Sequence, residues 1–294
     1  TFTHSLIATS IHSLKKTTMK IKKILPIILL ALFIHSCNSV PVTGRKQLTI
    51  IPNNELMAMS FQQYDEFLKE NPPSKNVQQT QVVKKVGNNI KNSVIKYMAD
   101  NNLSSMLDGY NWEFNYVDSD QVNAWCMPGG KVVVYSGIIP ITQDETGLAV
   151  VMGHEIAHAI ADHGNERMSQ ELIRQAGGVG LMVALNEQPQ ETQVMWMTVY
   201  GVGTEVAAML PYSRLHESEA DRMGLIFMAM AGYNPQEAPM FWERMSKQGG
   251  QKPPEFLSTH PSDQTRVNNL NKWMPEAMKY YSKSSQSSGN KDGN

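Results

Sequence analysis

Cysteine is scarce in this chain: Cys37 and Cys126 are the only two among 294 residues. So few cysteines exclude the class of small domains that several disulfide bonds hold together. Cys37 follows a leader-like segment and is expected to carry a lipid, which leaves Cys126 without an intramolecular partner. We therefore expect no disulfide bond, and we interpret Cys126 as a small buried apolar residue rather than a reactive thiol.

An excess of positive charge is also missing. Lysine and arginine number 26 against 27 aspartates and glutamates, and five of the lysines lie in the first 36 residues, which hold no acid. Without those five, the chain from Cys37 onward has 21 basic and 27 acidic residues, a net charge of −6. Such a surface has no basic stripe for a polyanion, so we expect no nucleic-acid partner.

The apolar run near the N-terminus is short. It covers eleven residues from Ile24 to Ile34 and includes Pro26, whereas a membrane-spanning helix needs about 20. Lysines precede it and Cys37 follows it, so the segment 19–36 resembles the signal peptide of a bacterial lipoprotein. We expect cleavage before Cys37 and a lipid on that cysteine. Residues 1–18 begin without methionine and precede a complete signal, so we expect them to be untranslated or to reflect a misplaced start.

The segment His154-Glu155-Ile156-Ala157-His158 indicates metal chemistry. On a helix, histidines four residues apart lie on one face within reach of one metal ion. Glu155, about 100° around the helix, is better placed to hold the reacting water than to bind the metal, an arrangement typical of zinc-dependent peptide hydrolysis. The alternative is a buried structural helix, which the nearly all-apolar flanks disfavour because buried ionisable groups need a partner.

Zinc needs a third protein ligand, and two places could supply it. In the metzincin pattern a glycine and a third histidine follow the pair, but Ala161 and Gly164 stand at those positions. His163 is one residue out of register. We interpret His163 as a polar residue at the helix end, or as one that supports a ligand, rather than as a ligand itself.

The second place is an acidic cluster downstream, where Glu217 and Asp221 are four residues apart and share a helix face. Glu217 would complete a set of two histidines and one glutamate. Asp221 would accept the free ring N–H of a ligand histidine, which we expect to be His154. Glu219 is the second choice for the ligand, and a solvated acidic face is the alternative for the whole cluster.

In this order, followed by Ser-Thr-His-Pro at 258–261 and by Arg266, the motifs resemble those of gluzincin metallopeptidases. That family includes the prenyl-protein (CAAX) endopeptidase and the heat-shock protease HtpX, and the chain is most similar to its Oma-like bacterial lipoproteins over residues 40–273. The resemblance implies an α+β, mostly helical, zincin-like domain with a small β-sheet beside the zinc helix. It also implies one Zn²⁺ per chain and endopeptidase activity on polypeptide substrates.

The resemblance suggests roles for further residues. His260 could stabilise the tetrahedral oxyanion or occupy the open zinc position in a resting state, although a loop histidine of this kind is as often simply exposed. Arg266 could pair with an acidic group near the site, with a surface arginine as the alternative. An extended substrate could add to a strand at the edge of the cleft, or that strand could merely support the helix. The candidate edge residues are Asn123, Ala124 and Trp125.

Several local elements can be predicted as well. Apolar spacing predicts helices over 54–69 and 77–100 and strands over 112–117 and 131–136. Thr142 and Glu145 could form a capping box for the zinc helix, Ser213 could cap the glutamate helix, and Gly232 could end it. Ser262 could cap a helix that contains Arg266.

We expect residues 37–52 to form a tether, 53–281 one zinc metallopeptidase domain, and the polar segment 282–294 a disordered tail. Residues 176–210 are rich in glycine, methionine and apolar side chains. Their glycines lack the lysine of a phosphate-binding loop. A helical hairpin that completes the core is the favoured interpretation of this segment, and a mobile lid or a membrane-contacting edge is the alternative.

The combined expectation is a zinc endopeptidase of the bacterial cell envelope, lipid-anchored through Cys37, in the outer membrane and facing the periplasm. It would cleave misfolded or membrane-associated proteins, and envelope chaperones or other proteases could be its partners. The alternative is a zinc-stabilised chaperone or assembly factor for envelope proteins with little proteolysis. A cytosolic metalloenzyme whose leader has been misread is a third possibility.

Overall fold

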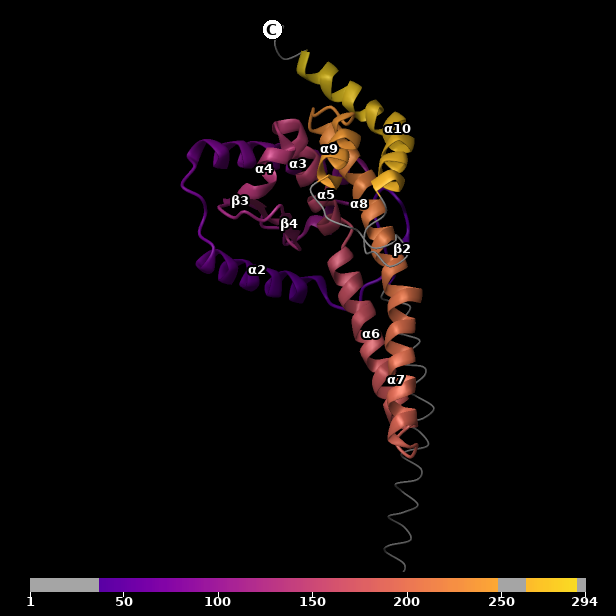
Figure 1. Ribbon diagram of the computed structural model, residues 1–294. Coiled ribbons are helices and arrows are strands. Elements are labelled where there is room, and N and C mark those ends of the chain that lie inside the picture. Colours follow the sequence, from indigo (N-terminus) through magenta and orange to yellow (C-terminus); the bar gives the residue numbers. More distant parts are fainter. Residues whose placement is uncertain (1–36, 248–262, 290–294) are drawn as a thin grey trace, which may run out of the picture.

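The computed structural model describes residues 37–247 and 263–289 (Figure 1). Most of these residues are helical, and two small sheets accompany the helices. The expected α+β, mostly helical, class is therefore confirmed. The helices are α2 (Asn53–Glu70), α3 (Val77–Asp100), α4 (Ile139–Thr142), α5 (Glu145–Ile160), α6 (His163–Ala184), α7 (Gln190–Thr204), α8 (Leu210–Met230), α9 (Glu237–Ser246) and α10 (Asp263–Gly289).

A three-stranded sheet forms one wall of the domain. Its order is β3 (Glu113–Val117), β5 (Lys131–Tyr135) and β4 (Ala124–Met127), with β5 parallel to β3 and antiparallel to β4. Val132 and Val134 face the main core, whereas Val133 packs with Tyr64 of α2 on the other face. Burial on both faces explains why β5 is a continuous β-branched run rather than an alternating one.

Helix α5 runs through the centre of the domain. Its N-terminal amides are capped by the side chain of Asp144, which accepts from the N–H groups of Thr146 and Gly147. The predicted capping box of Thr142 and Glu145 is therefore wrong: Thr142 belongs to the preceding turn α4, and its hydroxyl donates to the Ile139 carbonyl instead. Asp144 was the better candidate because a carboxylate at this position can accept two amides.

Helices α5 and α8 approach each other closely because glycines face each other at the crossing. A Cβ atom built on Gly224 would lie 3.0 Å from the backbone nitrogen of His154, and one on Gly153 would lie 3.1 Å from the carbonyl oxygen of Gly224. Neither position has room for a side chain without movement of backbone. This contact sets the distance between the two helices that carry the predicted metal ligands.

Helices α6 and α7 form an antiparallel hairpin that extends away from the domain (Figure 1). The turn between them lies at 185–189, at the polar break of the sequence, so the helical hairpin expected in 176–210 is confirmed. Its expected place in the core is wrong, because α7 buries no residue and both helices expose large apolar side chains. Helix α7 continues through a π-helical turn, η3 (Glu205–Met209), directly into α8. Ser213 therefore lies inside a helix and caps nothing, contrary to the prediction, whereas α8 ends at Met230 and Gly232 follows in a left-handed conformation, as expected.

Large apolar side chains cover the surface of this hairpin. Between residues 175 and 204 the sequence contains no lysine or arginine. Among the helices that the structure describes, none is sufficiently long and apolar to cross a membrane. The exposed apolar side chains are Met168, Leu172, Ile173, Val179, Met182, Val183, Val194, Met195, Trp196, Val199 and Val202.

The structure revises both ends of the predicted domain. Residues 37–52 are not a loose tether, because β1 (Cys37–Ser39) pairs antiparallel with β2 (Lys46–Leu48), and β2 packs against α6. At the other end, α10 continues to Gly289 through residues whose composition predicted disorder. The Ser284 hydroxyl donates to the Ala229 carbonyl at the end of α8, which fixes the start of that segment.

Candidate metal centre

Three side chains meet where α5 and α8 cross. His154 and His158 come from α5, and Glu217 comes from α8. The two Nε2 atoms lie 3.1 Å apart, and the Glu217 carboxylate oxygens lie 3.5 Å from that of His154 and 3.4 Å from that of His158. The structure thus brings together the three residues that the sequence predicts as metal ligands, and their ligand atoms all fall within 4.8 Å of one another.

The size of this triangle fits a zinc ion. Bonds of about 2.0–2.2 Å in a tetrahedral site place neighbouring ligand atoms about 3.4 Å apart. The three observed separations are 3.1, 3.4 and 3.5 Å. Two imidazoles and one carboxylate are also a ligand set that zinc takes in peptidases. Both the chemistry and the spacing of the donor atoms therefore suit zinc.

Asp221 and Arg266 support this triangle from behind. Asp221 Oδ1 lies 2.9 Å from His154 Nδ1, and neither atom has another hydrogen-bond partner among the described residues. Arg266 of α10 donates to Asp221 Oδ2 over 2.8 Å and to Glu217 Oε2 over 2.5 Å. Its guanidinium lies 3.8 Å above the Trp242 ring, which in turn packs edge-on against His154. Arg266 therefore does pair with acidic groups at the site, as the sequence suggested.

His163 supports the other histidine. Its Nδ1 lies 2.9 Å from His158 Nδ1, and its Nε2 lies 3.2 Å from Glu219 Oε2. The side chain is fully buried, and burial with the charges of His158 and His216 outweighs the effect of Glu219 and lowers the pKa of His163 to about 3, so the ring is neutral at pH 7. Of the two interpretations from the sequence, the structure favours a residue that supports a ligand, and it places Glu219 behind His163 rather than at the metal.

A buried ionic network continues from Glu219 to the N-terminal hairpin. Arg45, between β1 and β2, donates to both Glu219 oxygens and makes a bidentate pair with Glu166 over 2.8 and 2.6 Å. Glu166 also lies 2.8 Å from His216 Nε2, and the Thr43 hydroxyl donates to Glu219. Arg45 connects the hairpin to α6 and α8, and it fixes the carboxylate that holds His163.

Sequence reasoning missed this network. Arg45 lies in the segment predicted to be a tether, and no motif in the sequence marks His216. A signal was present for Glu166, since it is the acid in the first turn of a helix that begins at His163. No local pattern marks Arg45, because its partners are 121 and 174 positions away.

Burial and nearby charges set the protonation of the two α5 histidines. Burial lowers the pKa of His158 to about 4, so its imidazole is neutral at pH 7. Burial also acts to lower the pKa of His154, but the carboxylates of Asp221 and Glu217 outweigh it and raise that pKa to about 10. A positive charge between these carboxylates is therefore favoured, and a proton and a metal ion compete for the same place.

The predicted substrate strand lies beside α5 at an edge of the sheet. Ala124 and Trp125 belong to β4, and Asn123 precedes it, with its carbonyl accepting from the Tyr135 N–H over 3.1 Å. Trp125 packs edge-on against Phe67 of α2. Because β4 pairs only with β5 among the described strands, its outer backbone edge is not used within the sheet.

Two further residues lie at or near this strand. Burial raises the pKa of the Cys126 thiol well above its usual value, and the nearby Glu155 carboxylate adds to the effect, which fits an unreactive cysteine. Glu155 is half-buried on α5, next to His154. His260 and Ser262 lie outside the described residues, so their predicted roles stay predictions.

Comparison with known proteins agrees with this geometry. The model of peptidase family M48 matches residues 88–274. The mitochondrial metalloendopeptidase OMA1 of Saccharomyces cerevisiae is 36% identical over 63% of this chain and 53% of its own length. The mitochondrial metalloendopeptidase OMA1 of Bos taurus is 31% identical over 81% of this chain and 46% of its own.

A bacterial relative is similar as well. The β-barrel assembly-enhancing protease of Escherichia coli is 30% identical over 53% of this chain and 33% of its own length. The chain thus spans from a third to about half of the length of these relatives. Since the family match covers more than half of the chain and includes all three candidate ligands, the protein belongs to peptidase family M48, a family of zinc metallopeptidases.

Proposed function

We propose that this protein is a zinc endopeptidase of the bacterial cell envelope. The observation that carries the proposal is the triangle of His154, His158 and Glu217, whose donor atoms have the spacing of a tetrahedral zinc site. These three residues would hold the ion. Zinc, when bound there, would lower the pKa of a water molecule to about 7 and polarise the scissile carbonyl.

The side chains of the protein itself perform the proton transfers. Glu155 follows His154 directly on α5. It lies close enough to β4 for its charge to raise the pKa of Cys126. It would accept the proton of the attacking water and deliver it to the leaving amine, as a general base and then a general acid. Asp221 would hold the Nδ1–H of His154, and His163 would hold His158, which fixes both rings for metal binding.

The sheet supplies a place for the substrate. A polypeptide in extended conformation can pair its backbone with the outer edge of β4 through main-chain hydrogen bonds. Such binding needs no particular side chain, so it suits an enzyme that cleaves misfolded or membrane-associated proteins. His260 would assist as an oxyanion stabiliser or as a resting ligand.

Substitution at two glutamates tests these roles. Glu155→Gln should keep stoichiometric zinc and lose most peptidase activity, whereas Glu217→Ala should lose zinc affinity itself. Glu145→Gln serves as a matched control, since Glu145 lies on the same helix and pairs with Lys85 at the surface. Zinc content by mass spectrometry and cleavage of a quenched peptide library are the measurements. Loss of zinc from Glu155→Gln, or full zinc affinity in Glu217→Ala, would contradict the assignment.

Three observations support a location at the envelope. The N-terminal sequence has the pattern of a lipoprotein signal ending at Cys37, an E. coli relative is named for β-barrel assembly, and the α6–α7 hairpin exposes apolar side chains that suit the surface of a bilayer. Radiolabelled palmitate should appear on the protein and be absent from Cys37→Ser. A protein found in the soluble cytoplasmic fraction without label would contradict this part of the proposal.

The same relative favours a second candidate function. Its name joins assembly to proteolysis, and an edge strand that binds extended chains could also act as a chaperone. Glu155→Gln separates the two functions. If this variant fully restores the phenotype of a deletion strain, assembly rather than cleavage is the main task.

A further inference from the structure

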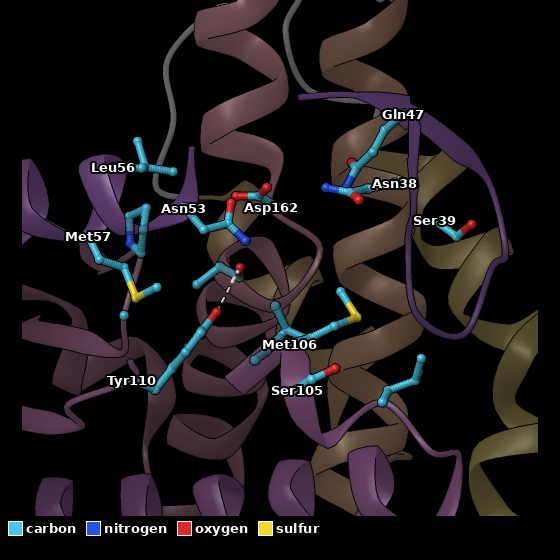
Figure 2. A pocket seen from close by; sticks show the side chains of 15 residues that line it. Asn38, Ser39, Gln47, Asn53, Leu56, Met57, Ser105, Met106, Tyr110 and Asp162 are labelled. Carbon is cyan, nitrogen blue, oxygen red and sulfur yellow. Dashed lines mark hydrogen bonds between the residues drawn. The ribbon is translucent and has the colours of Figure 1, made fainter. Parts of the chain in front are cut away.

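A cavity of about 320 Å³ lies at the C-terminal end of α5 (Figure 2). Its walls come from the hairpin β1–β2, the first turns of α2, the loop before β3 and the turn after β4. Binding sites for small ligands begin at about 300 Å³, so this space suits a single side chain or a molecule of similar size. It is separate from the three candidate metal ligands, none of which lines it.

Three buried polar atoms in its wall, on Gln47 and Asp162, have no hydrogen-bond partner in the part of the chain that the structure describes. Gln47 is 3% exposed, and neither its amide oxygen nor its amide nitrogen makes a hydrogen bond. The Oδ2 atom of Asp162 is likewise buried and unpaired. Figure 2 shows these side chains reaching the same space from β2 and from the start of α6. Buried polar groups without partners are costly, so these atoms are free to bind water or a ligand that enters the cavity.

The electrostatics of the cavity favour a cation. Asp162 and Tyr110 are its only ionisable lining residues, and no lysine, arginine or histidine takes part. Tyr110 donates its hydroxyl to the Ala159 carbonyl, and burial raises its pKa, so it stays neutral. The cavity lies between the C-terminus of α5 and the N-terminus of α6, whose dipoles have opposite sign there, so the negative charge that favours a cation comes from Asp162.

The pKa and the backbone conformation of Asp162 both suit the binding of a cation. Burial raises its pKa to about 7, against a smaller opposing effect of Asn165, and the charge of Glu166 raises it further. Its backbone is left-handed, with φ of 56° and ψ of 30°, a conformation that aspartate and asparagine adopt more readily than most residues. A cation in the cavity would stabilise the ionised carboxylate and lower that pKa.

The cavity also adjoins the proposed path of a substrate. Ala159, in its wall, lies one helical turn beyond Glu155 on the same side of α5, a rise of about 6 Å. Pro128 and Gly129, also in its wall, follow β4 directly. An extended chain advances about 3.3 Å per residue, so a residue about two positions from the cleaved bond could place its side chain here.

We propose that this cavity binds the ammonium or guanidinium group of a lysine or arginine side chain of a polypeptide substrate. Asp162 provides the negative charge, and Gln47 provides an acceptor oxygen and an N–H for a neighbouring carbonyl. The inference deepens the proposed peptidase function and rests on it, because it assigns a side-chain preference to the same cleft.

Binding can be tested without catalysis. The zinc-loaded full chain carrying Glu155→Gln would be titrated calorimetrically with Nα-acetyl-arginine amide and with its neutral isostere Nα-acetyl-citrulline amide. We expect the arginine amide to bind about tenfold to a hundredfold more tightly, the usual effect of a hydrogen bond to a charged group. Asp162→Asn should abolish that difference in affinity, and asparagine can keep the left-handed backbone of this position. The control Asp100→Asn, at the exposed end of α3, should leave the difference unchanged.

A second variant distinguishes a binding role from a structural one. Gln47→Leu removes two unpaired polar atoms, so it should raise the melting temperature of the free protein. The same variant should bind the arginine amide less tightly. Equal affinity for both amides, no binding of either, or displacement of the arginine amide by potassium or calcium ions at constant ionic strength would overturn the proposal. So would a Gln47→Leu variant that is destabilised yet binds normally.

Cleavage separates this inference from the proposed function. The wild-type enzyme should cleave peptides with arginine or lysine near the scissile bond faster than the citrulline versions, and Asp162→Asn should equalise them. If all peptides are cleaved equally, the cavity proposal fails and the peptidase proposal stands. If none is cleaved although the arginine amide binds, the peptidase proposal fails and the cavity remains a cation site.

Discussion

Replacement of Arg45 by methionine tests whether the N-terminal hairpin is part of the catalytic domain. Methionine keeps most of the apolar stem but removes the guanidinium from between Glu166 and Glu219, which are only 2% and 4% exposed. The two carboxylates would then be buried side by side without their shared cation. We expect the folded protein to lose stability and to bind zinc less tightly.

The expected loss is set by the cost of breaking a buried ion pair, and the pKa of Glu219 shows the combined effect of all its partners. Breaking a buried ion pair by removal of one partner costs about 3–5 kcal/mol. Burial alone would raise the pKa of Glu219, but hydrogen bonds from His163, Arg45 and Thr43 lower it from 4.5 to about 2, which corresponds to about 3 kcal/mol for all partners together. We therefore expect Arg45→Met to lower the free energy of unfolding by about 3 kcal/mol or more at pH 7.

Arg45→Met should also reverse the pH dependence of the contribution that these two glutamates make to the free energy of unfolding. In the wild type, the folded pKa of Glu219 is depressed, so its contribution is present above the unfolded value of 4.5 and is lost as the pH falls toward 2. In Arg45→Met, burial dominates and raises the pKa values of both glutamates. The variant should therefore become more stable relative to the wild type as the pH falls below 7.

Urea unfolding of the zinc-free protein, followed by tryptophan fluorescence between pH 4 and pH 8, measures both effects. Arg222→Met is the matched control, because Arg222 pairs with the partly exposed Glu276 and should cost less than about 1 kcal/mol. A cost for Arg45→Met no larger than that of the control, with an unchanged pH profile, would refute the reasoning. Zinc affinity should fall about tenfold to a hundredfold, since Arg45 acts through Glu219 and His163 on a ligand histidine.

Three further predictions concern other parts of the domain. Gly224→Ala should cost about 1–3 kcal/mol and lower zinc content, because its Cβ would meet the backbone of His154; unchanged melting and zinc content would contradict this. Cys126 is half-buried, and its raised pKa should make it react with iodoacetamide at pH 8 far more slowly than a free cysteine; labelling at the rate of a free thiol would contradict this. The raised pKa of Asp162 means that stability should fall as the pH rises from about 4 to about 7. Asp162→Asn should remove that decline in urea titrations, and an identical profile would argue against it.

Local periodicity was enough to predict the metal centre. His154 with His158, and Glu217 with Asp221, are each four residues apart, so each pair shares a helix face whatever the rest of the fold does. Strand β5 was also predictable, because Val132 to Val134 form a β-branched run between turn residues, whereas β1 and β2 lie in the segment expected to be a tether.

The supporting contacts could not be predicted in this way. Arg45 meets Glu166 and Glu219 only after the hairpin packs on α6 and α8, and no spacing in the sequence encodes that contact. The cap at Ser213 failed for a related reason. The apolar residues before Ser213 continue the helix instead of ending it, so a residue with good capping chemistry lies in the middle of a long helix.

That long helix has a mechanical consequence. Helices α7 and α8 form one rod from Gln190 to Met230, about 60 Å long at 1.5 Å per residue. The apolar surface lies at one end of this rod and Glu217 lies toward the other. A displacement of the apolar end is therefore coupled to the position of Glu217. The weakest point of the rod is the π-helical turn at Glu205–Met209, where helices bend most easily. A force on the hairpin either bends the rod there or is transmitted to Glu217.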